Sequence, residues 1–89
     1  MIFTRSSYDR RYKKLSPQQQ IVVDAAVVKF EQAVGKPHEH AGIGLRPFGR
    51  YLEFRAGLKL RILALPEDGD FFLMFVGVHD EVRAYVKNA

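Results

Sequence analysis

The spacing of apolar residues changes once along this chain, and that change constrains its fold more than any other feature. Up to residue 34, apolar residues recur at the 3.6-residue period of a helix face, as in Val23, Val27, Phe30 and Val34. From residue 50 onward they alternate with polar residues, which is typical of strands. A helical half followed by a strand half predicts an α+β fold, with helices packed on one face of a twisted antiparallel sheet.

Local signals place the elements of the first half. The run MIFT fits a short first strand, and residues 6–15 have helical spacing with Ser6 or Ser7 available as a cap. A second helix starts at a capping box, with Ser16 as N-cap and Gln19 three residues later, and Pro17 occupies its first position. Val34 should be its last residue, because Gly35 and Pro37 follow. The short linker predicts that the two helices form an antiparallel hairpin.

The second half predicts a three-stranded meander. Residues 37–49 form a loop, and RYLEFRAG and LKLRILAL are strands joined at Ala56-Gly57. PEDGD makes the next turn, and FFLMFVGV is apolar on both faces, as expected of an interior strand. The last residues, HDEVRAYVKNA, are either a short helix or a tail.

Size and charge limit the possible functions. A chain of 89 residues is large enough for one core only, so we expect a single domain over residues 1–89. Its net charge of +4 favours a polyanionic partner, either RNA or an acidic protein. Arginines interrupt the first residues, which argues against a signal region, and the longest apolar run, Phe71–Val76, is too short to span a membrane. We therefore expect a cytoplasmic protein without a membrane partner.

Basic residues gather at the start of the meander. Five of the fourteen fall within sixteen positions: Arg46, Arg50, Arg55, Lys59 and Arg61. Alternation predicts that Lys59 and Arg61 share one face of a strand, with Arg55 or Glu53 opposite them. Arginines fixed on strands bind phosphate well, because the guanidinium group is planar and held in place. A plain solvated face is the other interpretation.

His79 follows the last strand, and Tyr85 comes six residues later, with Arg83 and Lys87 nearby. Combined with the basic face, they predict cleavage of RNA without a metal. In that reaction the 2′-hydroxyl attacks the adjacent phosphate, and the site supplies a base, an acid and cations for the added charge. Histidine is the ordinary acid or base near neutral pH.

A metal site has weaker support. His38 and His40 are one residue apart and could share an ion with His79 and Asp80, but the spacing fixes no third ligand. The chain has no cysteine, which removes thiolate sites and disulfides. We expect no metal and no other cofactor.

Two segments resemble those of a known family. GLRPFGRYLEFRAGLKLRILAL and FVGVHDEVRAY are similar to the meander and the C-terminal end of RelE/ParE superfamily toxins, the small toxins of bacterial type II toxin–antitoxin systems. The resemblance implies a RelE-like toxin, an mRNA endonuclease that acts on the ribosome, inhibits translation and is silenced by a cognate antitoxin. It also implies catalytic roles for Arg61, His79 and Tyr85, and RNA-binding roles for Arg46, Arg50, Arg55 and Lys59. Arg83, which lies near His79 in the sequence, is a further RNA-binding candidate.

Two alternatives stay open. A ParE-type toxin of the same superfamily inhibits DNA gyrase and cuts no RNA, and the presence of both His79 and Tyr85 favours the nuclease over it. A non-catalytic RNA- or protein-binding domain would have the same fold and charge, because function depends on the site and not on the fold alone.

Overall fold

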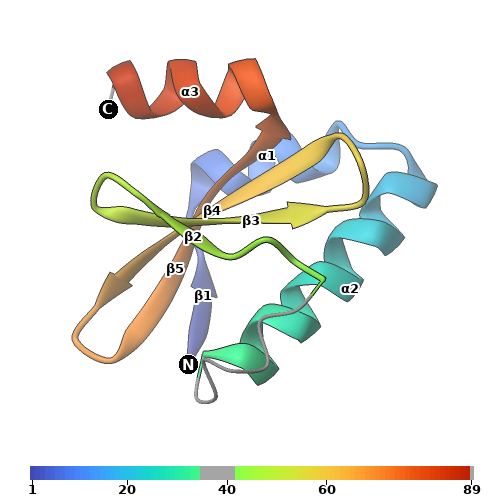
Figure 1. The fold of residues 1–89 in the computed structure, drawn as a ribbon. Helices are drawn as coiled ribbons and strands as arrows, with labels where there is room; N and C mark the ends of the chain where they lie inside the picture. Colours follow the sequence, from blue (N-terminus) through green and yellow to red (C-terminus); the bar gives the residue numbers. More distant parts are fainter. Residues whose placement is uncertain (35–41, 89) are drawn as a thin grey trace.

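A computed structural model describes residues 1–34 and 42–88 of the chain. Its elements are β1 (Ile2–Thr4), α1 (Ser6–Lys13), α2 (Pro17–Ala33), β2 (Arg46–Phe48), β3 (Tyr51–Ala56), β4 (Leu60–Glu67), β5 (Asp70–Val78) and α3 (His79–Asn88) (Figure 1). The five strands form one sheet in the order β1-β5-β4-β3-β2. The α+β class is confirmed. The sheet is mixed, because β1 runs parallel to β5 while the other neighbours are antiparallel.

The start of α2 is confirmed in detail. The Ser16 hydroxyl accepts a hydrogen bond from the Gln19 backbone N–H at 3.1 Å, and the Gln19 side chain accepts one from the Ser16 N–H at 2.9 Å. The helix ends at Ala33 with Val34 as its C-cap, one residue before the predicted end. The proposed stop at Gly35 and Pro37 lies outside the described residues.

The predicted serine cap of α1 is wrong. Arg5 is the N-cap, and no side chain caps the helix, because α1 follows β1 almost directly and both serines are already helical. Ser7 instead donates its hydroxyl to the backbone carbonyl of Met74 in β5.

Helix α1 occupies an edge of β5 that β1 leaves open. β1 pairs with β5 only along 71–73. Beyond that point Ser7 binds the carbonyl of Met74, and Arg11 Nε donates to the carbonyl of Val76 at 3.2 Å. Ser7 and Arg11 are four residues apart on the helix, which is a rise of about 6 Å, and Met74 and Val76 are two residues apart on the strand, which is about 6.6 Å. The spacing of the two side chains therefore matches the spacing of the two carbonyls. The two side chains thus satisfy carbonyls that a missing neighbour strand would have bound.

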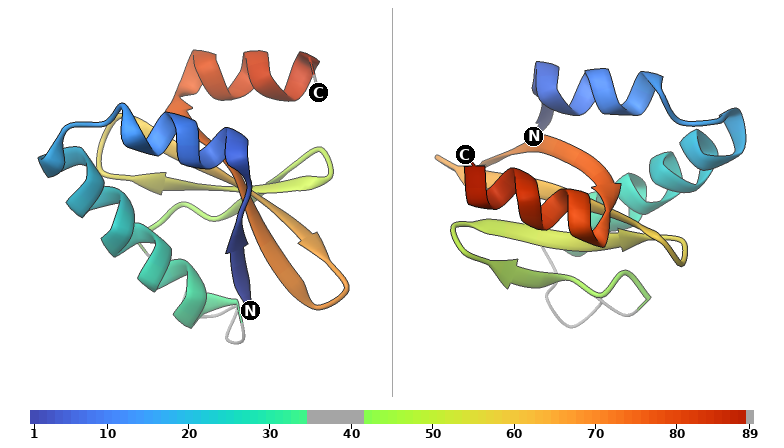
Figure 2. Two further views of the ribbon diagram at one scale, coloured as in Figure 1. Left: turned by 180° about the vertical axis from the view of Figure 1, so that it is seen from behind. Right: turned by 90° about the horizontal axis from the view of Figure 1, so that it is seen from above.

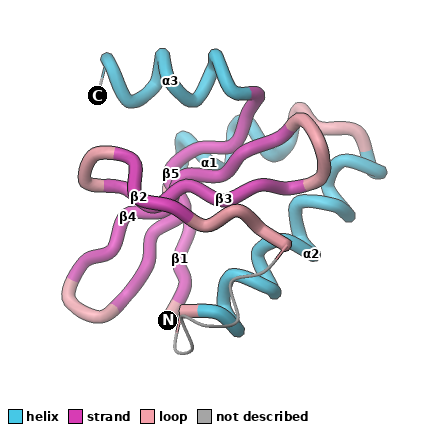
Figure 3. The backbone as a smooth tube through the Cα atoms, viewed as in Figure 1, coloured by secondary structure: helices cyan, strands magenta, loops and turns pink. Residues whose placement is uncertain are grey.

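The sheet has a core on each face. The alternation predicted for β3 and β4 is confirmed: one set of side chains packs against α1 and α2, where the rings of Phe30 and Phe54 stack with centroids 4.4 Å apart. The opposite set includes Tyr51 and Leu63, and it packs against Val82 of α3. The C-terminal residues therefore form a helix that covers the second face, well separated from α2 (Figure 2; Figure 3).

Two predictions about the meander need correction. The segment expected to be a loop, 37–49, contains β2, which pairs with 51–53; residues 37–41 of that segment lie outside the described residues. Lys59 is not on a strand beside Arg61, because β3 and β4 are joined by a three-residue turn, 57–59. Gly57 has φ +68°, but neither Leu58 nor Lys59 has a positive φ. The turn is therefore not the two-residue hairpin type in which both central residues have a positive φ.

One carboxylate fixes the start of α3. Glu81 Oε1 accepts the Val78 backbone N–H at 2.9 Å and lies 2.6 Å from Arg11 Nη2. The Val78 bond first, and then Arg11, lower the pKa of Glu81. This carboxylate therefore joins α1, the end of β5 and α3. Within residues 1–34 and 42–88, no helix is long and apolar enough to cross a membrane.

Because folding lowers the pKa of Glu81 below its ordinary value of 4.5, its charge stabilises the protein above that pH. This contribution disappears as pH falls through the folded-state pKa. We expect Glu81→Gln to lower the free energy of unfolding by about 0.5–1 kcal/mol at neutral pH, and to have a smaller effect at an acidic pH where the folded-state carboxyl is protonated. Urea unfolding at both pH values measures this, with Asp80→Asn as the control from the same helical turn. An equal loss at both pH values would contradict the assignment.

Candidate nucleic-acid interface

Helix α3 presents three different stripes, because residues four apart lie on the same side of a helix. Val82 and Val86 belong to the core of the second face. His79 and Arg83 lie along the flank next to β2. Tyr85 lies along the flank next to β5, in a separate hollow that Glu81 and Phe75 also line. The stripe spacing therefore separates the histidine from the tyrosine.

A hollow of about 420 Å³ lies between β2 and α3. It is lined by Arg46, Pro47, Phe48, His79 and Arg83, and we call it the β2–α3 hollow. Its two arginines are exposed, whereas Phe48 and His79 are half-buried. Nδ1 of His79 is buried and has no hydrogen-bond partner in the described part of the chain. The hollow thus combines two cations, one aromatic ring and a half-buried histidine.

Beside the hollow, a buried carboxylate holds two arginines. Glu53 is 1% exposed, and its Oε1 is 2.9 Å from Arg46 Nε and 3.1 Å from Arg61 Nη1. Glu53 sits on β3 directly opposite Arg46 of β2, so strand register creates the first pair. A buried charge is tolerated when it is paired and hydrogen-bonded. Each arginine gives one of its five N–H donors to Glu53 in these contacts, which leaves donors for an external phosphate.

The predicted residues do not all gather here. Arg46, His79 and Arg83 line the β2–α3 hollow, and Arg61 meets Arg46 at Glu53. Arg55 is opposite Arg61 in the strand register and is exposed.

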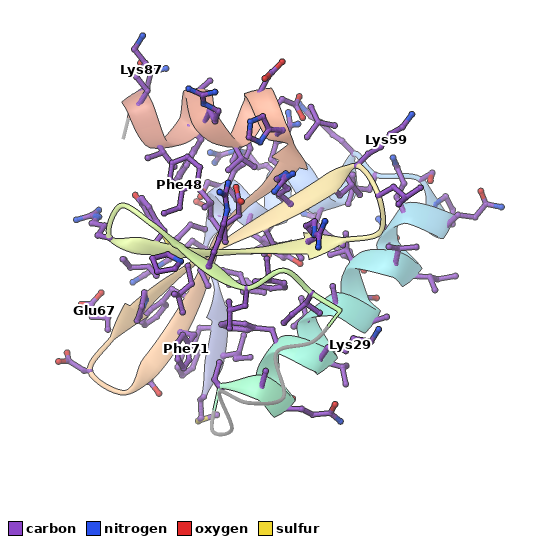
Figure 4. All side chains as sticks on the ribbon, in the orientation of Figure 1. Lys29, Phe48, Lys59, Glu67, Phe71 and Lys87 are labelled. Atoms are coloured by element: carbon purple, nitrogen blue, oxygen red, sulfur yellow. The ribbon has the colours of Figure 1, made fainter. Side chains whose placement is uncertain are left out.

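The other three lie elsewhere. Arg50 is in the β2–β3 turn, with its guanidinium carbon 5.4 Å from the centre of the Tyr51 ring. Lys59 projects from the β3–β4 turn (Figure 4) and lines a different hollow, near the N-terminal end of α2. Tyr85 stacks on Phe75 with ring centroids 4.6 Å apart.

Three residues of this region were not among the predicted site residues. Phe48 fell in the segment taken as a loop. Glu53 was expected on the charged face, but alternation could not show that it is buried between two arginines. Arg11, whose guanidinium carbon is 5.0 Å from the Phe75 ring centre, comes from a helix remote in sequence. None of these positions carries a signal in the sequence beyond its residue type.

The arrangement is suited to anions. Three arginines and a histidine converge from β2, β4 and α3, and they are the groups that bind phosphate in proteins. Within the described ranges, no group of three His, Cys, Asp or Glu residues is arranged to hold a metal ion. His38 and His40 lie outside those ranges.

The pairing of Glu53 with Arg61 predicts that replacing Arg61 alone costs more stability than replacing both residues. Arg61→Gln leaves the buried Glu53 charge with fewer partners and should cost about 1–3 kcal/mol of unfolding free energy. The double variant Glu53→Gln/Arg61→Gln should recover part of that loss, because no uncompensated charge remains. Urea unfolding measures both, and Arg55→Gln, opposite in the same register, is the exposed control with an effect within about 0.5 kcal/mol. Additive losses in the double variant would show that the pair is not coupled.

Comparison with known proteins identifies the fold. No family model matches the sequence, and no curated protein matches it. Among solved structures, a chain of the RelB–RelE antitoxin–toxin complex from Methanococcus jannaschii has a TM-score of 0.66 at 9% identity, covering 93% of this chain and 96% of that one. A copper-bound mutant toxin from Helicobacter pylori also gives 0.66, at 12% identity and with 91% and 96% coverage. A conserved hypothetical protein from the same organism gives 0.52 at 13% identity, with the same coverage. The chain therefore has the RelE-like fold that its sequence predicted.

Proposed function

We propose that this chain is the toxin of a type II toxin–antitoxin system and that it cleaves mRNA on the ribosome. One observation carries the proposal: Arg46, Arg61, His79 and Arg83 converge at and beside the β2–α3 hollow. The shared fold supports it, because one structure with this fold comes from an antitoxin–toxin complex. Cleavage on the ribosome places the protein in the cytoplasm.

The proposed reaction needs no metal. The 2′-hydroxyl oxygen attacks the neighbouring phosphorus, and the bond from phosphorus to the 5′-oxygen breaks. Arg46 and Arg61 hold the phosphate and stabilise its added negative charge, a role that suits donors already fixed by Glu53. His79 protonates the departing 5′-oxygen, and water in the open hollow takes the 2′-hydroxyl proton. The products are a 2′,3′-cyclic phosphate and a free 5′-hydroxyl.

Tyr85 has a predicted catalytic role, either as base or by stacking on the RNA, but it lines the opposite flank of α3 from His79. It can act on the same nucleotide only if the RNA crosses α3. Because its ring stacks on Phe75, we infer that its main contribution is to pack α3 on the sheet.

The cognate antitoxin is the proposed protein partner. A chain with net charge +4 fits an acidic partner as well as RNA. An antitoxin that covered the β2–α3 hollow would block the phosphate site directly, which gives inhibition a simple steric basis.

A second candidate is a non-catalytic RNA-binding domain. The observation that favours it is the placement of Tyr85 away from His79, together with the buried carboxylate that offsets part of the arginine charge. Binding would need only the arginines, whereas cleavage also needs the proton transfer of His79.

Translation in vitro with a defined mRNA separates these candidates. We expect new mRNA 5′ ends, mapped by primer extension, only when the protein and ribosomes are both present. His79→Ala should reduce their rate by about 10²–10⁴-fold, which is the usual contribution of an acid or base. Lys29→Gln, an exposed change on α2, is the control and should cut like the unaltered protein. Intact mRNA with translation proceeding would exclude the nuclease and leave gyrase inhibition or plain binding.

The same reaction tests Tyr85. Tyr85→Phe keeps the ring on Phe75 and removes only the hydroxyl, so we expect cleavage within a few-fold of the unaltered protein. A loss as large as that of His79→Ala would identify Tyr85 as the base and require RNA across α3.

A further inference from the structure

We propose that Phe48 is a stacking platform for one unpaired nucleobase of the RNA, held in the β2–α3 hollow with its phosphate on Arg46 and Arg83. This inference deepens the proposed function and rests on it. It adds a recognition residue to a site that otherwise consists of charges.

The position of Phe48 is fixed, yet its ring remains accessible. It ends β2, an outer strand of the sheet, and pairs with Tyr51 of β3. The side chain packs partly against the core of the second face and is only half-buried. The rest of it lines the hollow, on the side where β2 meets α3 (Figure 4). A ring that is already held by its packing loses little entropy when a base stacks on its exposed part.

The surroundings of the ring match a nucleotide. The guanidinium carbon of Arg46 lies 5.7 Å from the ring centre, and Arg83 and His79 line the same hollow. An unpaired nucleotide presents a flat π surface next to a negative phosphate, and single-stranded RNA is bound by such combinations of aromatic rings and cations. The volume of about 420 Å³ is within the range of small-ligand sites.

The wall that His79 forms adds a further reason. His79 is half-buried and lines the hollow beside Arg83. A base or sugar in the hollow would lie against the exposed part of its ring. An acidic peptide would satisfy the arginines but would leave the Phe48 ring without a flat partner.

The test measures binding apart from cleavage. The probe is a fluorescein-labelled hexanucleotide with 2′-fluoro sugars, which cannot be cleaved because attack needs the 2′-hydroxyl. The second probe is the same strand without bases. Anisotropy titrations of the full chain should show that the strand with bases binds about 5- to 150-fold more tightly, as one stacked base would give. Phe48→Leu should remove the preference for the strand with bases and leave the salt dependence of binding unchanged. Phe48→Tyr should keep both the preference and the salt dependence.

Arg83→Gln is the matched variant for the phosphate. It should weaken both probes alike and reduce the slope of log affinity against log salt by about 0.7. Thermal unfolding of Phe48→Leu checks that the fold is retained. If the leucine variant unfolds, Phe48→Tyr decides, because loss of the base preference in a folded variant that keeps an aromatic ring would contradict the inference.

The outcomes separate the inference from the proposed function. If Arg83→Gln weakens binding and Phe48→Leu does not, the stacking role is wrong and the phosphate site stands. If the unaltered protein binds neither probe, or if poly-glutamate displaces them at lower concentration than unlabelled RNA of equal length, the inference fails. Ribosome-dependent cleavage is then judged by primer extension alone.

Discussion

The carboxylate of Glu53 is the interaction on which the site depends. It is almost fully buried in β3, and its Oε1 contacts arginines from β2 and β4. A charge in that position is stable only with partners, so the fold itself holds Arg46 and Arg61 in place. The two guanidinium groups are therefore already ordered before any phosphate arrives. Preorganised donors of this kind stabilise developing charge without further rearrangement.

The hollow exists because α3 lies on the second face of the sheet, and α1 helps to place α3. Ser7 and Arg11 bind carbonyls of β5 where β1 has ended, and Arg11 also reaches Glu81 at the start of α3. A helix from the beginning of the chain thus orients the last one. Once α3 is set, its residue spacing directs His79 and Arg83 toward β2 and Tyr85 toward β5.

Local signals predicted much of the fold, and tertiary contacts decided most of the site. The capping box at Ser16 and the alternation of β3 and β4 depend on neighbouring residues, and both could be read from the sequence. The short strand β2 has only three residues, too few to show a period. The burial of Glu53 depends on tertiary packing, and Lys59 was misplaced because the turn is longer than expected. The convergence of Arg46 with His79 follows from packing that no local pattern contains.

The most direct test of the account is an mRNA that carries a single 2′-deoxynucleotide at the mapped cleavage position. Attack by the 2′-hydroxyl is the step that the arginines and His79 are proposed to support, and this substitution removes only that oxygen. We predict that ribosome-dependent cleavage at that position disappears, while an mRNA with the deoxynucleotide one position away is cut normally to give a 2′,3′-cyclic phosphate. Continued cleavage at the deoxy position would contradict the account, because the nucleophile would then come from elsewhere.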